Sequence, residues 1–198
     1  MSTEPGSLHA VDPAAAGLDA GLDTESAEAL TRVLGLIRDV PDYPSPGIMF
    51  RDITPVLADA EAFETVATEL AALVGAADVV VGIEARGFLI GAAVALVAGT
   101  GIVPVRKSGK LPLVAGSVTY ELEYGTATLE LPAETLASGA RAFVVDDVLA
   151  TGGTAAATCA LLADAGVEVE GFGALLELTA LGGRDRLGAV PVHALLQA

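Results

Sequence analysis

The sequence contains one cysteine, no tryptophan and few basic residues, and these scarcities exclude several classes of protein. Because Cys159 is the only cysteine among 198 residues, neither an intrachain disulfide nor a cysteine-based metal cluster can form. The chain has 10 lysines and arginines against 26 acidic residues, a formal net charge of -16. Nucleic acid is therefore a poor partner, since basic side chains supply most of the affinity for phosphate backbones. The few basic residues instead become candidates for a local anion site.

The sequence also lacks a clear membrane span and a secretory signal. Residues 88–105, FLIGAAVALVAGTGIVPV, approach the length of a span, but glycines near residue 100 and Pro104 divide them into a helix and a short strand. The N-terminal residues have no basic segment followed by a continuous apolar run. We therefore expect a cytoplasmic protein without membrane or nucleic-acid partners. A disordered acidic tail is expected at residues 1–22 and a single domain at residues 23–198.

Helical and extended patterns alternate along the chain. One helix is predicted from Thr24 to about Val40, and another across DAEAFETVATELAALVG, ending at Gly75. Between them lies PDYPSPGIMFRDITPVL, whose four prolines indicate a linker or a rigid binding loop. The segments DVVVGIE, GIVPVR, FVVDDVL and VEVEGFGALLEL then read as strands separated by helical segments. This order predicts an α/β fold with a mostly parallel sheet.

The segment SVTYELEYGTATLEL interrupts this alternation, because polar and apolar residues alternate around Gly125 and predict a β-hairpin. Ligands of open parallel sheets bind beyond the carboxyl ends of the strands. Three predicted strands end in or near charged groups, so we expect these groups to converge at one edge of the sheet. They are Glu84, Arg86, Arg106, Lys107, Asp146 and Asp147.

The segment VVDDVLATGGTAAA joins a predicted strand to a predicted helix. It lacks both the lysine of the P-loop and the glycine spacing of the dinucleotide-binding motif. The glycines and threonines of residues 151–154 nevertheless suit a phosphate, because its oxygens would accept from backbone N–H groups, hydroxyls and the positive end of the helix. Asp146 and Asp147 would repel phosphate, but carboxylates suit ribose hydroxyls or hydrated magnesium. The segment therefore predicts a site for ribose 5-phosphate.

Several of these features have structural alternatives. Taken singly, the acidic pair or TGGT could be an ordinary acidic turn with a glycine-rich connection; their combination at a strand-to-helix turn makes the signal specific. Glu123 lies two residues from Glu121 on the same strand face, and either could be a solvated charge. Phe50 could be a core anchor, and His193 is expected to pack within the fold.

The segment VVDDVLATGGT closely resembles the phosphoribosyl-diphosphate signature of the type I phosphoribosyltransferases. DYPSPGIMFRDITPVL, GIEARGFLIG, VPVRKSGKLP, YELEYGTATLEL and LLELTALGGRDRL are similar to the adenine-specific branch, and the resemblance covers about residues 25–198. It implies the type I phosphoribosyltransferase fold: a twisted, mostly parallel sheet flanked by helices, with a flexible β-hairpin over the active site. It also implies transfer of the 5-phosphoribosyl group from phosphoribosyl diphosphate to adenine, giving AMP and diphosphate in purine salvage, with Mg²⁺ and a homodimer.

The same resemblance assigns roles to residues. Glu123 matches the family's acidic hairpin residue, which assists proton movement at the purine, and Arg86 is the second catalytic candidate. Whether Glu123 acts as a general acid/base or only positions the purine stays open. Magnesium would be held mainly by substrate and water, near the acidic pair. The binding assignments are Asp146, Asp147, Ala150, Thr151, Gly152, Gly153 and Thr154 for ribose 5-phosphate; Arg86, Arg106, Lys107 and Lys110 for diphosphate; and Met49, Phe50 and Arg51 for adenine.

Two other functions stay open at this point. The acceptor could be hypoxanthine, guanine or xanthine, although the rigid PGIMF segment fits adenine better. Alternatively, the protein could be a regulator that senses the phosphoribosyl ligand. Such a regulator needs a DNA-binding element, and the short acidic N-terminal segment has no basic helix-turn-helix pattern.

Overall fold

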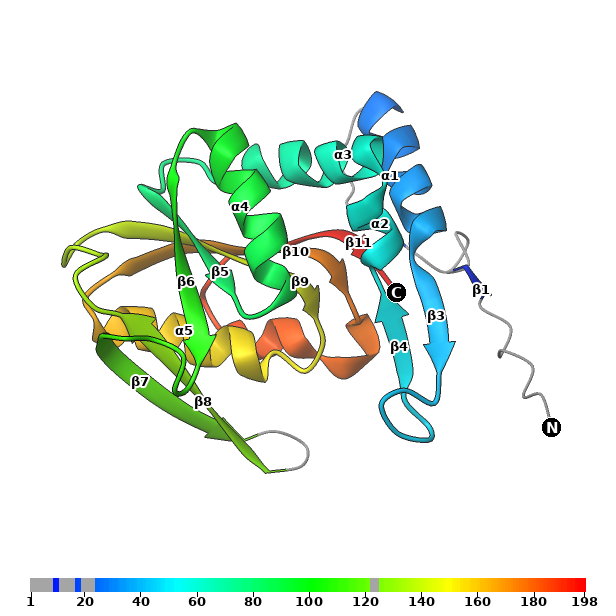
Figure 1. Cartoon of the computed structure of the whole chain (residues 1–198). Coiled ribbons are helices and arrows are strands. Elements are labelled where there is room, and N and C mark those ends of the chain that lie inside the picture. Colours follow the sequence, from blue (N-terminus) through cyan, green and yellow to red (C-terminus); the bar gives the residue numbers. More distant parts are fainter. Residues whose placement is uncertain (1–8, 11–16, 19–23, 122–124) are drawn as a thin grey trace.

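The computed structural model describes residues 9–10, 17–18, 24–121 and 125–198, and these form an α/β domain built on an eight-stranded sheet (Figure 1). The strand order is β2-β11-β10-β9-β5-β6-β8-β7. The neighbours from β11 to β6 run parallel, whereas β2, β8 and β7 pair antiparallel with their neighbours. The bounds are β2 Gly17–Leu18, β5 Val79–Ile83, β6 Gly101–Lys107, β7 Val114–Glu121, β8 Thr126–Pro132, β9 Arg141–Leu149, β10 Glu168–Glu177 and β11 Val192–Gln197. The predicted mostly parallel sheet is confirmed.

Helices cover both faces of the sheet, which is why its central strands are apolar on both sides. Helices α1 to α4 lie on one face and α5 lies on the other (Figure 1). Val80 and Phe143 belong to the core under α1 to α4, whereas the next residues, Val81 and Val144, belong to the core under α5. Successive strand side chains point to opposite faces, so VVVGI in β5 is buried throughout. The bounds are α1 Thr24–Leu36, α2 Thr54–Ala58, α3 Ala60–Ala71, α4 Arg86–Ala98 and α5 Gly153–Asp164.

The first helix is shorter than its sequence pattern predicts. It ends at Leu36, and β3 (Arg38–Pro41) follows at once, so the predicted end near Val40 is wrong. Residues 38–41 instead pair antiparallel with β4 (Met49–Asp52), and this pairing is supported by an ion pair of 2.5 Å from Arg38 Nη2 to Asp52 Oδ2. Tertiary pairing therefore overrides the local helical pattern.

The proline-rich segment predicted as a linker or rigid loop contains regular structure. Its residues 49–52 form β4, the second strand of a hairpin with β3, and its last residues enter α2. The next helix, α3, ends at Ala71, earlier than the predicted end at Gly75. Residues 72–75 form a turn that closes with Gly75 in the left-handed region, at φ 61°.

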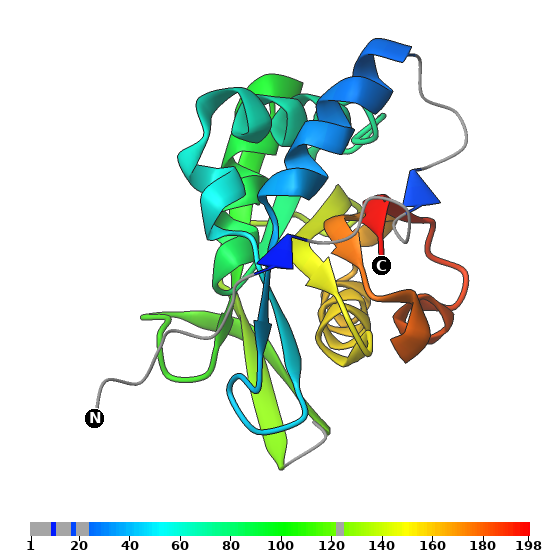
Figure 2. The same ribbon diagram turned by 90° about the vertical axis from the view of Figure 1, so that its right-hand side faces the viewer.

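Two hairpins project from the domain in the same direction (Figure 2). One is β3–β4, and the other is β7–β8, in which Tyr120 pairs with Ala127 and Glu121 pairs with Thr126. The hairpin predicted around Gly125 is thereby confirmed. The end of β7, the start of β8 and the turn between β3 and β4 lie on the same side of the domain (Figure 1).

The described part of the N-terminal segment makes two short strand pairings. β1 (His9–Ala10) pairs antiparallel with β3, forming a separate three-stranded sheet with β4, and Gly17–Leu18 pairs with the C-terminal strand β11. The disordered tail at residues 1–22 stays a prediction. Residues 88–105 divide into α4 and β6 as expected, and no helix in the described residues is long and apolar enough to cross a membrane.

Candidate active site

Charged groups from β5, β6 and β9 meet near the carboxyl ends of these neighbouring strands. Arg86 Nε lies 2.8 Å from Asp147 Oδ2, which joins the segment after β5 to β9. Arg106 Nε at the end of β6 lies 3.4 Å from Glu84 Oε2, which follows β5. The predicted convergence of these strand ends is confirmed by the two ion pairs.

The turn between β9 and α5 encloses a small cavity of about 80 Å³. Its walls are formed by residues of β9 and of the TGGT turn, and α5 begins at Gly153. The first N–H groups of a helix have no acceptors within the helix, so they suit an anion at this position. The lining residues are Asp146, Val148, Leu149, Ala150, Thr151, Gly152, Gly153, Thr154 and Ala155. The structure thus brings together every residue that the sequence assigned to the ribose 5-phosphate except Asp147, which lies beside the cavity.

A second backbone segment supports the phosphate turn. Gly152 adopts φ 77°, and a Cβ atom placed on it would lie 2.3 Å from the carbonyl oxygen of Gly183. A Cβ placed on Gly183 would lie 2.2 Å from the carbonyl oxygen of Ala150. Both positions therefore require glycine, because the two backbones touch. Gly183 begins the short helix η2 (Gly183–Leu187), which sequence reasoning did not connect with the turn.

Helix η2 is held in place by an ion pair and places a cation near the cavity. Arg184 donates to the buried carboxylate of Glu177 through Nη2 at 2.5 Å and Nε at 3.1 Å. The exposed side chain of Arg186 places Nη1 3.5 Å from the position that a Cβ on Gly153 would occupy. Sequence reasoning missed both arginines, although the LGGRDRL segment that carries them was part of the family resemblance.

The acidic pair has two different environments. The side chain of Asp147 is buried, and its Oδ2 has no hydrogen bond of good geometry despite the ion pair with Arg86. Asp146 Oδ1 accepts the N–H of Asp147 at 2.9 Å. Burial, and then the neighbouring Asp147 carboxylate, raise the pKa of Asp146 well above its usual range. Burial therefore makes this carboxyl group hold its proton more tightly than an exposed aspartate does.

The base-binding candidates lie on β4, and Arg86 connects them to the acidic pair. The Arg86 guanidinium carbon lies 5.1 Å from the centre of the Phe50 ring, and the Tyr43 ring meets Phe50 edge-on at 5.0 Å. Phe50 is half-buried and belongs to neither hydrophobic core, so the alternative that it is a core anchor is wrong. Met49 is exposed, whereas the side chain of Arg51 forms an ion pair with Asp39.

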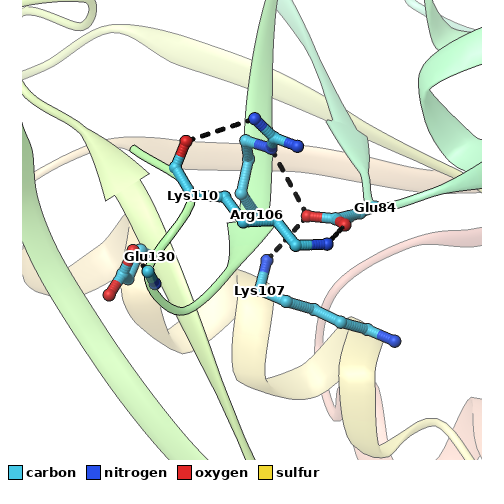
Figure 3. Close-up of polar contacts among 6 residues, drawn as sticks. Glu84, Arg106, Lys107, Lys110 and Glu130 are labelled. Atoms are coloured by element: carbon cyan, nitrogen blue, oxygen red, sulfur yellow. Dashed lines mark hydrogen bonds and ion pairs between the residues drawn. The ribbon is translucent and has the colours of Figure 1, made fainter. Parts of the chain in front are cut away.

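The diphosphate candidates are organised by Glu84, a residue to which sequence reasoning assigned no role (Figure 3). The Glu84 carboxylate accepts the backbone N–H of Lys107 at 2.9 Å and forms ion pairs with Arg106 and Lys110. Burial alone would raise the pKa of Glu84, but hydrogen bonds from Lys110 and from the Lys107 N–H outweigh it, and this pKa is lowered. The Lys107 side chain points away from Glu84 (Figure 3). The signal in the sequence that could have identified Glu84 is its position directly after a buried strand.

The remaining catalytic candidate, Glu123, lies outside the described residues. Strand β7, which leads toward it, runs beside α5 and reaches the phosphate turn. There the Tyr120 hydroxyl lies 3.0 Å from Thr154 Oγ1. The hairpin is thus joined to the start of α5 by a hydrogen bond that sequence reasoning did not predict.

Comparison with known proteins agrees with this arrangement. The family model of the phosphoribosyl transferase domain matches residues 56–188, a range that runs from α2 through the phosphate turn to Gly188. The fold and the site therefore define a phosphoribosyltransferase domain.

Similar proteins narrow this class. The adenine phosphoribosyltransferase of Saccharopolyspora erythraea is 57% identical over 183 residues, covering 89% of this chain and 96% of the relative. That of Kineococcus radiotolerans is 59% identical over 169 residues, covering 84% and 91%. The crystal structure of adenine phosphoribosyltransferase from Thermoanaerobacter pseudethanolicus is similar with a TM-score of 0.82 at 44% identity, covering 85% of this chain and 99% of that one. The chain belongs to the adenine phosphoribosyltransferase family.

Proposed function

We propose that this chain is a cytoplasmic enzyme of purine salvage that transfers the 5-phosphoribosyl group from phosphoribosyl diphosphate to adenine, giving AMP and diphosphate. The observation that carries the proposal is the continuity of the site. Asp146 lines the phosphate cavity at the start of α5, and its neighbour in sequence, Asp147, pairs with Arg86, which in turn lies over Phe50. A similar structure from Saccharomyces cerevisiae, 35% identical, was determined as a complex with adenine and an imino-altritol bisphosphate.

The reaction breaks the bond from the anomeric carbon to the diphosphate oxygen and forms a bond from that carbon to a ring nitrogen of adenine. Positive charge develops on the ribose and negative charge on the diphosphate, so fixed cations at the leaving group lower the barrier. Arg86 and the basic residues of the Glu84 cluster, Arg106, Lys107 and Lys110, would supply these cations. Residues 150–154 would hold the 5-phosphate and so fix the position of the anomeric carbon.

The acceptor would bind between the two hairpins. Phe50 on β4 would stack on the purine, and backbone groups of Met49 and Arg51 would contact its amino edge. Water competes with adenine for the anomeric carbon, so the site has to exclude it, and closure of the β7–β8 hairpin would do so. Glu123 would then reach the purine. We expect Glu123→Ala to lower kcat more than it raises the KM for phosphoribosyl diphosphate; an unchanged kcat would remove Glu123 from the mechanism.

The acidic pair suits a magnesium ion that is bound mainly by the substrate. The described residues contain no group of three or more histidine, cysteine, aspartate or glutamate side chains able to hold a metal. Asp146 lines the cavity and Asp147 follows it in β9, and two carboxylates suit a hydrated ion held mainly by substrate oxygens. A cation would also favour ionisation of Asp146, whose pKa is raised. When bound, the ion would neutralise charge on the diphosphate.

A homodimer is the proposed assembly. The outer face of α4 exposes Leu89, Leu96 and Val97, with relative exposures of 54%, 83% and 53%. Large apolar side chains clustered on one helix face are typical of a protein interface. Light scattering should give twice the chain mass for the native protein, and Leu96→Glu is expected to shift this mass toward that of a monomer.

A purine competition assay tests the proposed reaction. The purified protein would be incubated with Mg²⁺, phosphoribosyl diphosphate and one of adenine, hypoxanthine, guanine or xanthine, and the nucleotide product identified. AMP from adenine alone is expected, and its formation should stop with EDTA and return with added Mg²⁺. Product from an oxopurine would overturn the base assignment. Ligand binding without any product would favour the sensor alternative.

A further inference from the structure

A hydrogen bond between two hydroxyl groups joins the hairpin to the phosphate turn. Tyr120, near the end of β7, places its hydroxyl 3.0 Å from Oγ1 of Thr154, the second residue of α5. Thr154 lines the cavity, whereas Tyr120 does not. The tyrosine therefore contacts a residue of the cavity wall without lining the cavity itself.

The Tyr120 ring is fixed by packing. Its Cδ2 lies 3.7 Å from the position that a Cβ on Gly153 would occupy. The carbonyl oxygen of Glu121 also lies 3.7 Å from that Cβ position. Farther along the strand, Gly116 lies against Leu161 of α5, where an added Cβ would be 3.3 Å from Cδ1. The Tyr120 ring also packs against the core under α5. Strand and helix are therefore in close contact along this length, and the hydroxyl is held in place.

The chemistry of the two hydroxyls decides which one donates when an anion is present. A hydroxyl has one proton to donate and can accept more than one hydrogen bond. A phosphate oxygen without a proton only accepts. While the bond between the two hydroxyls is retained, Thr154 can therefore donate to a phosphate only if Tyr120 donates to Thr154. The two bonds then form a chain from tyrosine to threonine to phosphate, in which each strengthens the other.

We propose that Tyr120 is a positioning residue that orients the Thr154 hydroxyl so that its proton points at the 5-phosphate. This inference rests on the proposed phosphate site at residues 150–154. It extends that site to the hairpin, so that a group outside the cavity contributes to the affinity for every ligand that carries the 5-phosphate.

The experiment compares ligands that carry the 5-phosphate with one that does not. AMP and ribose 5-phosphate would be titrated calorimetrically, and inhibition by diphosphate measured with Mg²⁺. Tyr120→Phe removes the hydroxyl and retains the ring, and it is expected to weaken AMP and ribose 5-phosphate by about 2- to 10-fold, the range for one hydrogen bond. Inhibition by diphosphate should stay unchanged.

Two further variants separate positioning from a general structural effect. Thr154→Val should weaken the same ligands at least as much, and adding Tyr120→Phe to it should have no further effect, because the tyrosine acts through the threonine hydroxyl. Thr119→Val is the matched control. It removes a hydroxyl from the same strand, where Thr119 Oγ1 lies 2.8 Å from Thr128 Oγ1, and should change no affinity.

Each contrary outcome has a distinct meaning. Unchanged AMP affinity in Tyr120→Phe, with weakened affinity in Thr154→Val, would overturn the role of Tyr120 and leave the phosphate site intact. An equal effect of Tyr120→Phe with and without the Thr154 hydroxyl, or an equal loss of diphosphate inhibition, would also overturn that role. Unchanged affinities in Thr154→Val would overturn the phosphate contact itself, and the inference with it.

Discussion

Replacing Gly152 by alanine forces apart two backbones that touch. The left-handed conformation at φ 77° costs a non-glycine residue roughly 1–2 kcal/mol. The new Cβ would lie 2.3 Å from the carbonyl oxygen of Gly183, closer than the 3.0 Å below which Cβ contacts essentially never occur. Overpacking of this kind costs about 1–3 kcal/mol. Gly152→Ala should therefore lower the free energy of unfolding by about 2–5 kcal/mol and the Tm by roughly 4–20 °C.

The neighbouring Gly153→Ala is a matched control. The nearest atom to its added Cβ is Arg186 Nη1 at 3.5 Å, an ordinary contact with the end of a flexible side chain. Because alanine also favours helices, Gly153→Ala should lose no stability. Urea unfolding and thermal denaturation of the two variants beside the unmodified protein measure the difference. If Gly152→Ala were as stable as Gly153→Ala, the close backbone contact at Gly183 would be refuted.

Three other perturbations have expected outcomes. The folded-state pKa of Asp146 is raised, chiefly by burial. The stability that the protonated Asp146 carboxyl contributes is therefore fully present below the unfolded pKa of about 3.9 and is lost as pH rises through the folded pKa. Asp146→Asn should therefore raise the Tm at pH 8 but not at pH 4, and parallel Tm profiles across pH would contradict this. Arg184→Gln leaves the buried Glu177 carboxylate without its paired cation and should lower the free energy of unfolding by about 2–3 kcal/mol, after allowance for the exposure of the arginine. Arg141→Gln, which removes an exposed ion pair, should change this free energy little. Equal effects of the two variants in urea unfolding would contradict the distinction between the buried and the exposed carboxylate. Burial raises the pKa of the Cys159 thiol to about 11. A thiol reagent at pH 8 should therefore modify Cys159 slowly until urea unfolds the chain, whereas rapid modification of the native protein would contradict this burial.

The convergence of charged groups could be predicted from the sequence because it depends on a general property of parallel sheets. Glu84, Arg106 and Asp147 each occur in or directly after an apolar strand, and neighbouring parallel strands end on the same side. The phosphate turn was predictable for a similar reason, since a strand, a glycine pair and a helix follow one another without interruption.

Other features depend on partners that are distant in the sequence. Residues 38–41 have a pattern that can continue a helix, and only their pairing with residues 49–52 makes them a strand. Likewise, nothing local to Tyr120 indicates a threonine 34 residues later. Periodicity describes what an element can bury, but it does not specify which side chain meets which across two elements.

The contact between Gly152 and Gly183 has a consequence for protein engineering. The phosphate turn is not a portable module, because its conformation depends on a backbone carbonyl supplied by a segment about thirty residues later. A turn grafted alone onto another strand-to-helix connection would retain its glycines and threonines but lose the surface that supports them. A successful transplant would have to carry η2, together with the Glu177–Arg184 pair that anchors it, as part of the same unit.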